Sequence, residues 1–121
     1  MGNFKVIAYE TEKGTAPVEE FLDSVNVKMR AKIYGLLEIL QEKGNTLRES
    51  YTKYLEDGIY ELRCKFGSDI VRVLYFFYYG GKIVLTNGFV KKMQKTPKKE
   101  IELAKIRRKD FMERITKNEN V

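Results

Sequence analysis

The chain contains no histidine and only one cysteine, and these two shortages exclude several kinds of site. Without histidine there can be no Ser-His triad and no histidine-based acid–base pair. One cysteine and no histidine leave no ligand set for a zinc ion. The lone cysteine also excludes an internal disulfide and indicates a reducing compartment.

Motifs that bind nucleotide phosphates or catalytic metal ions are missing as well. The sequence has no glycine-rich phosphate loop and no G-x-G-x-x-G pattern. Its 17 acidic residues are scattered, which disfavours a magnesium-dependent nuclease site. An enzyme of this composition has to work with Arg, Lys, Tyr, Glu and backbone groups. We therefore expect no metal and no small-molecule cofactor.

Long hydrophobic runs are also missing. Residues 1–25 mix apolar and charged positions and do not form the hydrophobic region of a secretory signal. The most apolar run, Ile70–Tyr79, is too short to span a bilayer and contains Arg72. The sequence thus predicts a cytoplasmic protein without a membrane partner, folded as one domain over residues 1–121.

Positive charge is concentrated in one block near the C-terminus. Residues 91–109 contain nine basic and two acidic residues, an excess of +7, whereas the whole chain carries +6. The remaining residues therefore sum to −1. Such a block is typical of a surface that meets a phosphate backbone or an acidic partner, but a solvated basic helix accounts for the charge equally well.

Two helices are predicted in the first third of the chain. Pro17 opens a short helix that runs to Asp23, and Asn26 is a good N-cap for a longer helix that ends at Lys43 before Gly44. The apolar residues of the longer helix recur at helical spacing: Met29, Ile33, Leu36, Leu37 and Leu40. We expect a helical hairpin with one face packed on a sheet.

Strand patterns supply that sheet. Phe4–Tyr9 alternates weakly, and three stronger candidates follow one another closely: Ile59–Phe66, Ile70–Tyr79 and Lys82–Phe89. Their short connections favour an antiparallel meander. Residues 45–58 look like a polar connection that ends in an Asp57-Gly58 turn. The sequence predicts an α+β fold, a small antiparallel sheet with the helical hairpin on one face and a C-terminal helix.

The C-terminal helix is predicted from Pro97 to about Thr116, with Thr96 as its N-cap. Its apolar stripe consists of Ile101, Ala104, Phe111 and Ile115. Arg108 interrupts this stripe, so we expect the helix, residues 97–116, to be more mobile than the rest of the domain.

Alternation along the strands sorts charged from apolar side chains. In Ile59–Phe66 the even positions are apolar, which predicts that Tyr60 faces the core and that Cys64 is a core thiol. The odd positions Glu61, Arg63 and Lys65 face the other way. If the next strand pairs as a hairpin, Arg63 and Arg72 share an open face, where Glu61 could pair with Arg72 or Lys65.

A basic loop follows the last predicted strand and leads into the C-terminal helix. It contains no carboxylate before Glu100, and its cations and amide are Lys91, Lys92, Gln94, Lys95, Lys98 and Lys99. Converging with the two arginines beside Tyr and Phe rings, these residues predict an RNA-binding surface. The alternatives are a solubilising loop and a docking patch for an acidic segment of a partner.

Four segments in this order resemble the phage-derived HigB-like branch of the RelE toxin superfamily of bacterial toxin–antitoxin systems. The segments are Pro17–Asp23, Leu55–Arg63, Arg72–Phe76 and Gly88–Pro97, with continuation through Glu100–Ala104. The resemblance covers about residues 4–115. It implies a RelE-like (microbial RNase-like) fold and an mRNA interferase that cuts messages on the ribosome. The implied partners are ribosome-bound mRNA and an antitoxin with a helix-turn-helix domain.

The resemblance also implies roles for individual residues. Arg63, Arg72 and Lys92 (or Lys91) match basic catalytic positions of the superfamily, and Lys95 lies in the same loop as Lys92. Metal-free cleavage would use the ribose 2′-oxygen as nucleophile, the arginines would bind the phosphoryl oxygens, and Glu61 or a lysine would take the proton. The remaining candidates are RNA-binding: Lys65, Lys91, Gln94, Lys98 and Lys99.

Two departures from the superfamily leave the general acid and base open. The chain has no match to its C-terminal catalytic tyrosine and none of the histidines found in some HigB proteins. An alternative function is therefore a non-catalytic module of the same fold, whose basic face binds nucleic acid or a partner. A separate alternative for Arg63 and Arg72 is that they are ordinary solvated strand residues.

Overall fold

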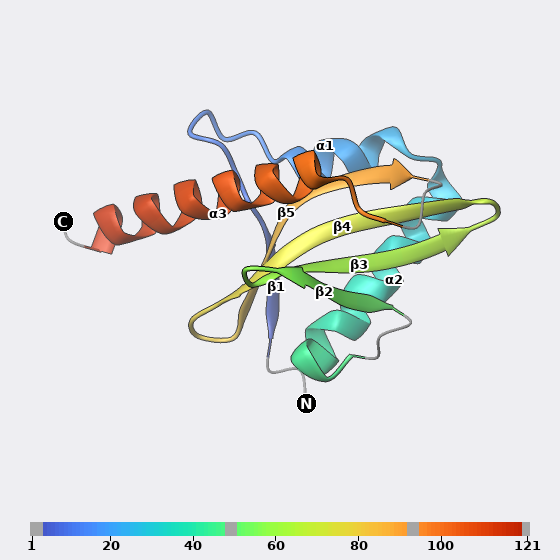
Figure 1. Cartoon of the computed structure of the whole chain (residues 1–121), viewed down its shortest axis with the longest axis horizontal. Helices are drawn as coiled ribbons and strands as arrows, with labels where there is room; N and C mark the ends of the chain where they lie inside the picture. The colour runs from blue at the N-terminus through green and yellow to red at the C-terminus, as the bar shows by residue number, and fades with distance from the viewer. Residues whose placement is uncertain (1–3, 48–50, 92–94, 120–121) are drawn as a thin grey trace.

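A computed structural model describes residues 4–47, 51–91 and 95–119 (Figure 1). The elements in chain order are β1 (Lys5–Ala8), α1 (Pro17–Ser24), α2 (Val27–Lys43), a 3-10 turn η1 (Gly44–Thr46), β2 (Thr52–Glu56), β3 (Ile59–Phe66), β4 (Asp69–Tyr78), β5 (Lys82–Lys91) and α3 (Lys98–Glu119). The five strands form one sheet, with α1 and α2 on one face and α3 on the other (Figure 1). The α+β class and the helix arrangement predicted from the sequence are confirmed.

The sheet is mixed, which corrects the prediction of an antiparallel sheet. Its strand order is β1-β5-β4-β3-β2, and β1 runs parallel to β5 while all other neighbours are antiparallel. The meander β3-β4-β5 follows from short connections, as expected. The parallel pair has no such local signal, because the helical hairpin and strands β2–β4 separate β1 from β5 in the chain.

Strand β2 was not predicted, because its five residues form the sheet edge and are largely polar. It pairs with β3 through a two-residue connection, Asp57-Gly58, in which both residues have positive φ (51° and 79°). Two positive φ values are typical of the type I′ turn that matches the twist of a hairpin. The Asp57-Gly58 turn signal was thus correct, but the strand before it was read as loop.

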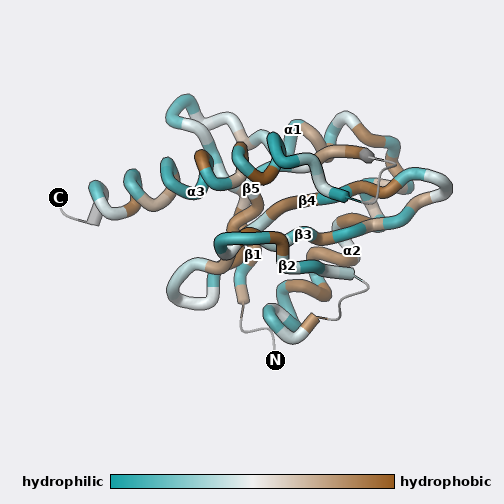
Figure 2. The backbone as a smooth tube through the Cα atoms, viewed as in Figure 1, coloured by the Kyte–Doolittle hydropathy of each residue, from teal (hydrophilic) through white to brown (hydrophobic). Residues whose placement is uncertain are grey.

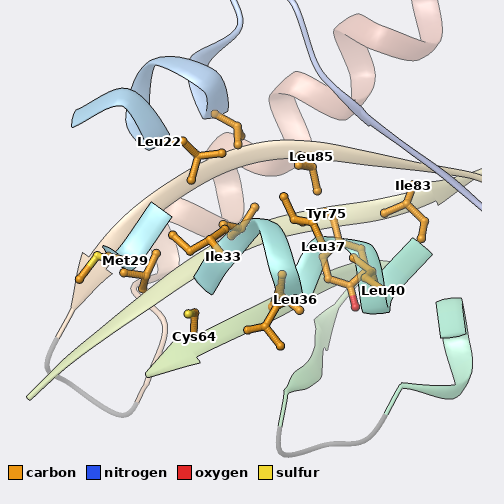
Figure 3. Packing of buried hydrophobic residues seen from close by; sticks show 14 residues of the cluster. Leu22, Met29, Ile33, Leu36, Leu37, Leu40, Cys64, Tyr75, Ile83 and Leu85 are labelled. Carbon is orange, nitrogen blue, oxygen red and sulfur yellow. The ribbon is translucent and has the colours of Figure 1, made fainter. Parts of the chain in front are cut away.

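The larger core lies between the sheet and the helical hairpin (Figure 3). The predicted stripe of α2 is buried in full, as are Leu62 and Cys64 on β3. The Asn26 side chain accepts a hydrogen bond from the Met29 amide at 2.8 Å and caps α2, and Gly44 follows its last residue with φ 55°. Cys64 is 2% exposed and packs as a core thiol, as predicted.

A second core lies on the opposite face, beneath α3. Ala104 and Phe111 of the helix pack against buried Leu74, Phe76 and Val84 of β4 and β5. Hydrophobic residues run along β4, whereas α3 is mostly hydrophilic (Figure 2). The last turns of α3 extend beyond the sheet (Figure 1). Among the residues that the structure describes, no helix is long and apolar enough to cross a membrane.

Candidate functional site: a buried carboxylate between two arginines

The register of β3 and β4 brings the two predicted arginines together. Arg63 and Arg72 are direct partners across the antiparallel pair, so they share a face, as the sequence predicted. Directly paired residues project from the same face of a sheet, here the face that carries α3. The two arginines lie toward the end of the sheet at which β3 ends, β4 begins and β5 ends (Figure 1).

Glu61 lies between the arginines and binds both. Its Oε1 accepts a hydrogen bond from Arg63 Nε at 2.7 Å, and its Oε2 lies 3.7 Å from Arg72 Nη1. The Thr96 hydroxyl donates to Glu61 Oε2 and accepts from Arg72 Nη1 at 3.2 Å. We call these four residues the Glu61 cluster. The predicted pairing of Glu61 with Arg72 is confirmed, and Arg63 is an additional partner.

The face that holds the cluster is covered, whereas the sequence predicted an open face. Glu61 is 0% and Arg72 1% exposed, because α3 packs on this face of the sheet and Thr96, just before α3, contacts both side chains. Only Arg63, with 31% of its side chain exposed, can be reached from solvent. Strand alternation assigns side chains to a face, but it does not reveal which later segment covers that face.

Burial of this ionic cluster is tolerable because its charges satisfy one another. An isolated buried carboxylate or guanidinium would be strongly unfavourable, whereas paired and hydrogen-bonded charges compensate much of that cost. Both Glu61 oxygens are occupied, so a substrate hydroxyl has no access to them in this conformation. Glu61 is therefore placed to hold the arginines.

Thr96 is the member of the cluster that the sequence did not indicate as a site residue. It was read as the N-cap of α3, but the helix begins at Lys98 and the Thr96 hydroxyl bonds to Glu61 and Arg72. Thr96 is 7% exposed. These two hydrogen bonds attach the residue two positions before α3 to strands β3 and β4. Only the need of a buried carboxylate for a donor could have suggested this contact.

The predicted lysines fall into three groups. Lys65, Lys95, Lys98 and Lys99 are exposed. Lys91 ends β5, and its backbone pairs with Ile70, whose other neighbour across the sheet is Lys65. Lys92 and Gln94 lie outside the described residues. The structure therefore gathers Arg63, Arg72 and Glu61 in one cluster and places Lys65 and Lys91 at the same end of the sheet.

The aromatic rings expected beside these cations lie mostly on the other face. Tyr60 faces the core, as predicted, and its ring stacks on that of Tyr75 with the centroids 5.5 Å apart. Burial raises the pKa of the Tyr75 hydroxyl to about 12. Phe89 is the ring on the α3 face that pairs with Arg72 across the strands.

Much of the basic block on α3 is used within the protein. Lys105 Nζ binds Glu56 Oε2 at 2.5 Å, Arg108 Nη2 binds Asp57 Oδ2 at 3.0 Å, and Arg107 Nη1 donates to the Thr86 carbonyl at 2.8 Å. These contacts attach α3 to the sheet and to the β2–β3 turn. Arg108, which seemed to break the apolar stripe, therefore has a partner of its own.

A second polar cluster joins the later part of α3 to the end of β1. The buried Tyr9 hydroxyl donates to Asp110 Oδ2 at 2.6 Å, and Arg114 Nη2 binds the same oxygen at 2.9 Å. The hydrogen bond from Tyr9, helped by Arg114, lowers the pKa of Asp110, and burial raises the pKa of Tyr9. This cluster anchors the helix.

Carboxylates elsewhere do not form a metal site in the described part of the chain. No group of three or more His, Cys, Asp or Glu side chains there is arranged to hold a metal ion. The chemical capacity of the Glu61 cluster is electrostatic: Arg63 can bind an anion from solvent, and Arg72 adds a second guanidinium only if Thr96 moves aside.

Comparison with known proteins gives one finding. No curated protein matches the chain. A family model described as phage-derived protein Gp49-like matches residues 20–109, which include most of α1, all of α2, strands β2–β5 and the first half of α3. The chain therefore belongs to the phage-derived Gp49-like protein family, a RelE/HigB-like family associated with toxin–antitoxin systems.

Proposed function

We propose that the protein is the toxin of a type II toxin–antitoxin system and acts as a ribosome-dependent mRNA endoribonuclease. The observation that carries the proposal is the pair of arginines held side by side by one carboxylate, with the exposed Lys65 two residues beyond Arg63 on β3. The family to which the chain belongs supports the toxin role. The nuclease activity and its dependence on the ribosome are inferred from the site.

The proposed reaction requires no metal. The 2′-oxygen of a ribose forms a bond to the adjacent phosphorus, the bond from phosphorus to the 5′-oxygen breaks, and the 5′-oxygen takes a proton. The products are a 2′,3′-cyclic phosphate and a 5′-hydroxyl. Negative charge grows on the phosphoryl oxygens in the transition state, and a guanidinium placed there lowers the barrier. Arg63 is the residue we assign to this contact, because solvent reaches it.

The remaining roles follow from exposure. Glu61 is assigned to positioning, since both of its oxygens are engaged. The 2′-hydroxyl then loses its proton to a water molecule, and an exposed lysine at this end of the sheet gives a proton to the departing 5′-oxygen, since an ammonium group is a donor. Lys65 and Lys95 are the described candidates. Lys91, Lys98 and Lys99 are assigned to the RNA backbone, and Lys92 and Gln94 keep their predicted roles. The ribosome supplies orientation, which can contribute about 7–11 kcal/mol.

A reaction with purified components tests the proposal. A radiolabelled message is bound to ribosomes with a vacant A site and incubated with wild-type protein, with Arg63→Ala, or with Lys28→Ala, which removes an exposed cation from α2. Wild type and Lys28→Ala should produce fragments that end in a 2′,3′-cyclic phosphate, also in the presence of EDTA. Arg63→Ala should cut at least 100-fold more slowly. Equal cutting by wild type and Arg63→Ala would remove Arg63 from the mechanism.

A non-catalytic binding module is the second candidate, and one observation favours it. Arg72 is 1% exposed and bonded to Thr96, so the described conformation offers a ligand only one of the two arginines. If the wild-type protein binds ribosomes or RNA in the same reaction without producing cyclic phosphate ends, this candidate replaces the nuclease.

A further inference from the structure

A cavity of about 370 Å³ lies on the side of the sheet away from the Glu61 cluster, between α1, α2 and the outer strand β1. Its apolar walls are Val6, Ala8, Val18, Leu22, Leu37 and Leu85. Leu22, Leu37 and Leu85 come from α1, α2 and β5 and lie near one another in Figure 3. None of the residues that line the cavity belongs to the basic block or to the Glu61 cluster.

Strand β1 forms the edge of the sheet beside this cavity. The amides of Lys5 and Tyr9 donate to carbonyls of residues 81 and 85, on the β5 side. Because successive amides of a strand point in opposite directions, the amides of Val6 and Ala8 face outward. The Val6 amide donates to Gln41 Oε1 at 3.0 Å. No side chain among the described residues accepts a hydrogen bond from the Ala8 amide, so the edge of β1 is open at Ala8.

The rim of the cavity is acidic. Glu19 and Glu38 are its only charged lining residues, both are exposed, and neither forms an ion pair with another described residue. A nucleic acid would be repelled here. The site instead fits a polypeptide that brings apolar side chains for the walls and a basic side chain for the rim. An extended segment would also satisfy the open edge of β1 by strand addition.

We propose that this cavity and the edge of β1 together dock an extended, apolar and basic segment of the antitoxin. The segment pairs with the outer edge of β1 at Ala8, inserts an apolar side chain between α1 and α2, and places a cation beside Glu19 and Glu38. The identity of the partner rests on the proposed function, whereas the chemistry of the segment rests on the cavity alone. Because the Glu61 cluster lies on the opposite face of the sheet, an antitoxin segment bound here would not contact that cluster.

Charge reversal with a matched control tests the docking surface. The probe is the product of the gene adjacent to the one that encodes this chain, titrated calorimetrically into three forms of the full chain. These are wild type, Glu19→Lys/Glu38→Lys, and the control Glu12→Lys/Glu20→Lys, which makes the same charge change at exposed positions outside the cavity. We expect the first variant to raise the Kd at least 10-fold at low salt and the control to change it less than 2-fold.

Hydrogen exchange provides the second readout, because it reports strand addition directly. The amide of Ala8 should exchange at least 10-fold more slowly after the probe is added to wild type. Equal affinities of the two double variants, an unchanged Ala8 amide or no binding to wild type would each overturn the proposal. Protection of Ala8 in a homodimer without the probe would assign the edge to a second copy and overturn it too.

Growth arrest after induction of the chain alone is scored separately, since it tests the proposed function and not the docking surface. The Glu19→Lys/Glu38→Lys variant should still arrest growth, but co-expression of the adjacent gene should no longer relieve the arrest. A chain that binds the probe through this edge yet never arrests growth would contradict the toxin role and leave the docking surface intact.

Discussion

At the scale of single residues, Glu61 organises the candidate site although it is not exposed. Its two oxygens bind Arg63 on its own strand, Arg72 on the next strand and Thr96 before α3. A carboxylate in this position fixes the two guanidinium groups before any substrate arrives, and such preorganisation is what electrostatic catalysis needs. It also turns three separate segments of the chain into one unit.

Replacement of this carboxylate should be costly. Glu61→Gln removes the negative charge that lies 3.7 Å from the buried Arg72, and loss of one partner from a buried ion pair typically costs about 3–5 kcal/mol. We expect that loss in the free energy of unfolding measured with urea. Glu56→Gln is the control, since Glu56 forms an ion pair with Lys105 at the surface, and it should have a much smaller effect. Equal losses for the two variants would show that the Glu61 cluster is not an ionic unit.

At the scale of elements, the attachment of α3 to the rest of the protein should weaken at low pH. The pKa of Asp110 is lowered by its hydrogen bond from Tyr9 and by Arg114, so the folded state favours the carboxylate. Its contribution is present above the ordinary aspartate pKa of about 4 and is lost as the pH falls through the lowered value. Wild type should therefore lose more stability below pH 4 than Asp110→Asn does, as followed by thermal unfolding. Parallel pH profiles for the two proteins would refute this role of Asp110.

The mobility of α3 expected from the sequence remains a prediction, and the structure makes it more specific. The helix packs through Ile101, Ala104 and Phe111, whereas Thr116 and Lys117 are exposed where it passes beyond the sheet. Hydrogen exchange should therefore be slow at residues 101–111 and progressively faster toward residue 119. Uniform protection at core level along the whole helix would count against this gradient.

Helix caps and strand alternation, which involve residues close together in the sequence, correctly predicted α2 and β3. Asn26 and Gly44 indicated the two ends of α2, and alternation predicted both the first and the last residue of β3 correctly. The parallel pairing of β1 depends on a distant part of the chain and gave no such signal, and the short edge strand β2 gave none because it is largely polar. The same distinction applies to the site: the pairing of Arg63 with Arg72 follows from a hairpin, whereas the burial of Arg72 involves Thr96, which lies 24 positions later in the chain.

At the scale of the whole molecule, net charge overstates what is available to a nucleic acid. Lys105, Arg107 and Arg108 are bound to acceptors within the protein, whereas Lys98 and Lys99 are exposed at the start of α3. We therefore expect fewer basic side chains to contact RNA than the basic block of residues 91–109 contains.

The salt dependence of binding tests this distinction. Each single-strand phosphate contact contributes about −0.7 to the slope of log K against log salt concentration. Lys98→Ala/Lys99→Ala should therefore make the slope for a single-stranded RNA shallower by about 1.4. Lys105→Ala/Arg108→Ala removes the same charge from engaged positions and should reduce stability with little change in slope. Equal slope changes for the two variants would mean that the whole block contacts RNA.

The central claim, that the protein cuts translated mRNA with Arg63 as a catalytic residue, is tested most directly by mapping RNA 5′-ends in cells shortly after induction. Wild type, Arg63→Ala and Lys28→Ala should be compared at equal soluble levels, with and without a translation inhibitor. We predict new ends within translated codons for wild type and Lys28→Ala, their loss when translation is blocked, and none for Arg63→Ala. New ends that persist in Arg63→Ala, or none with abundant soluble wild type, would contradict the claim.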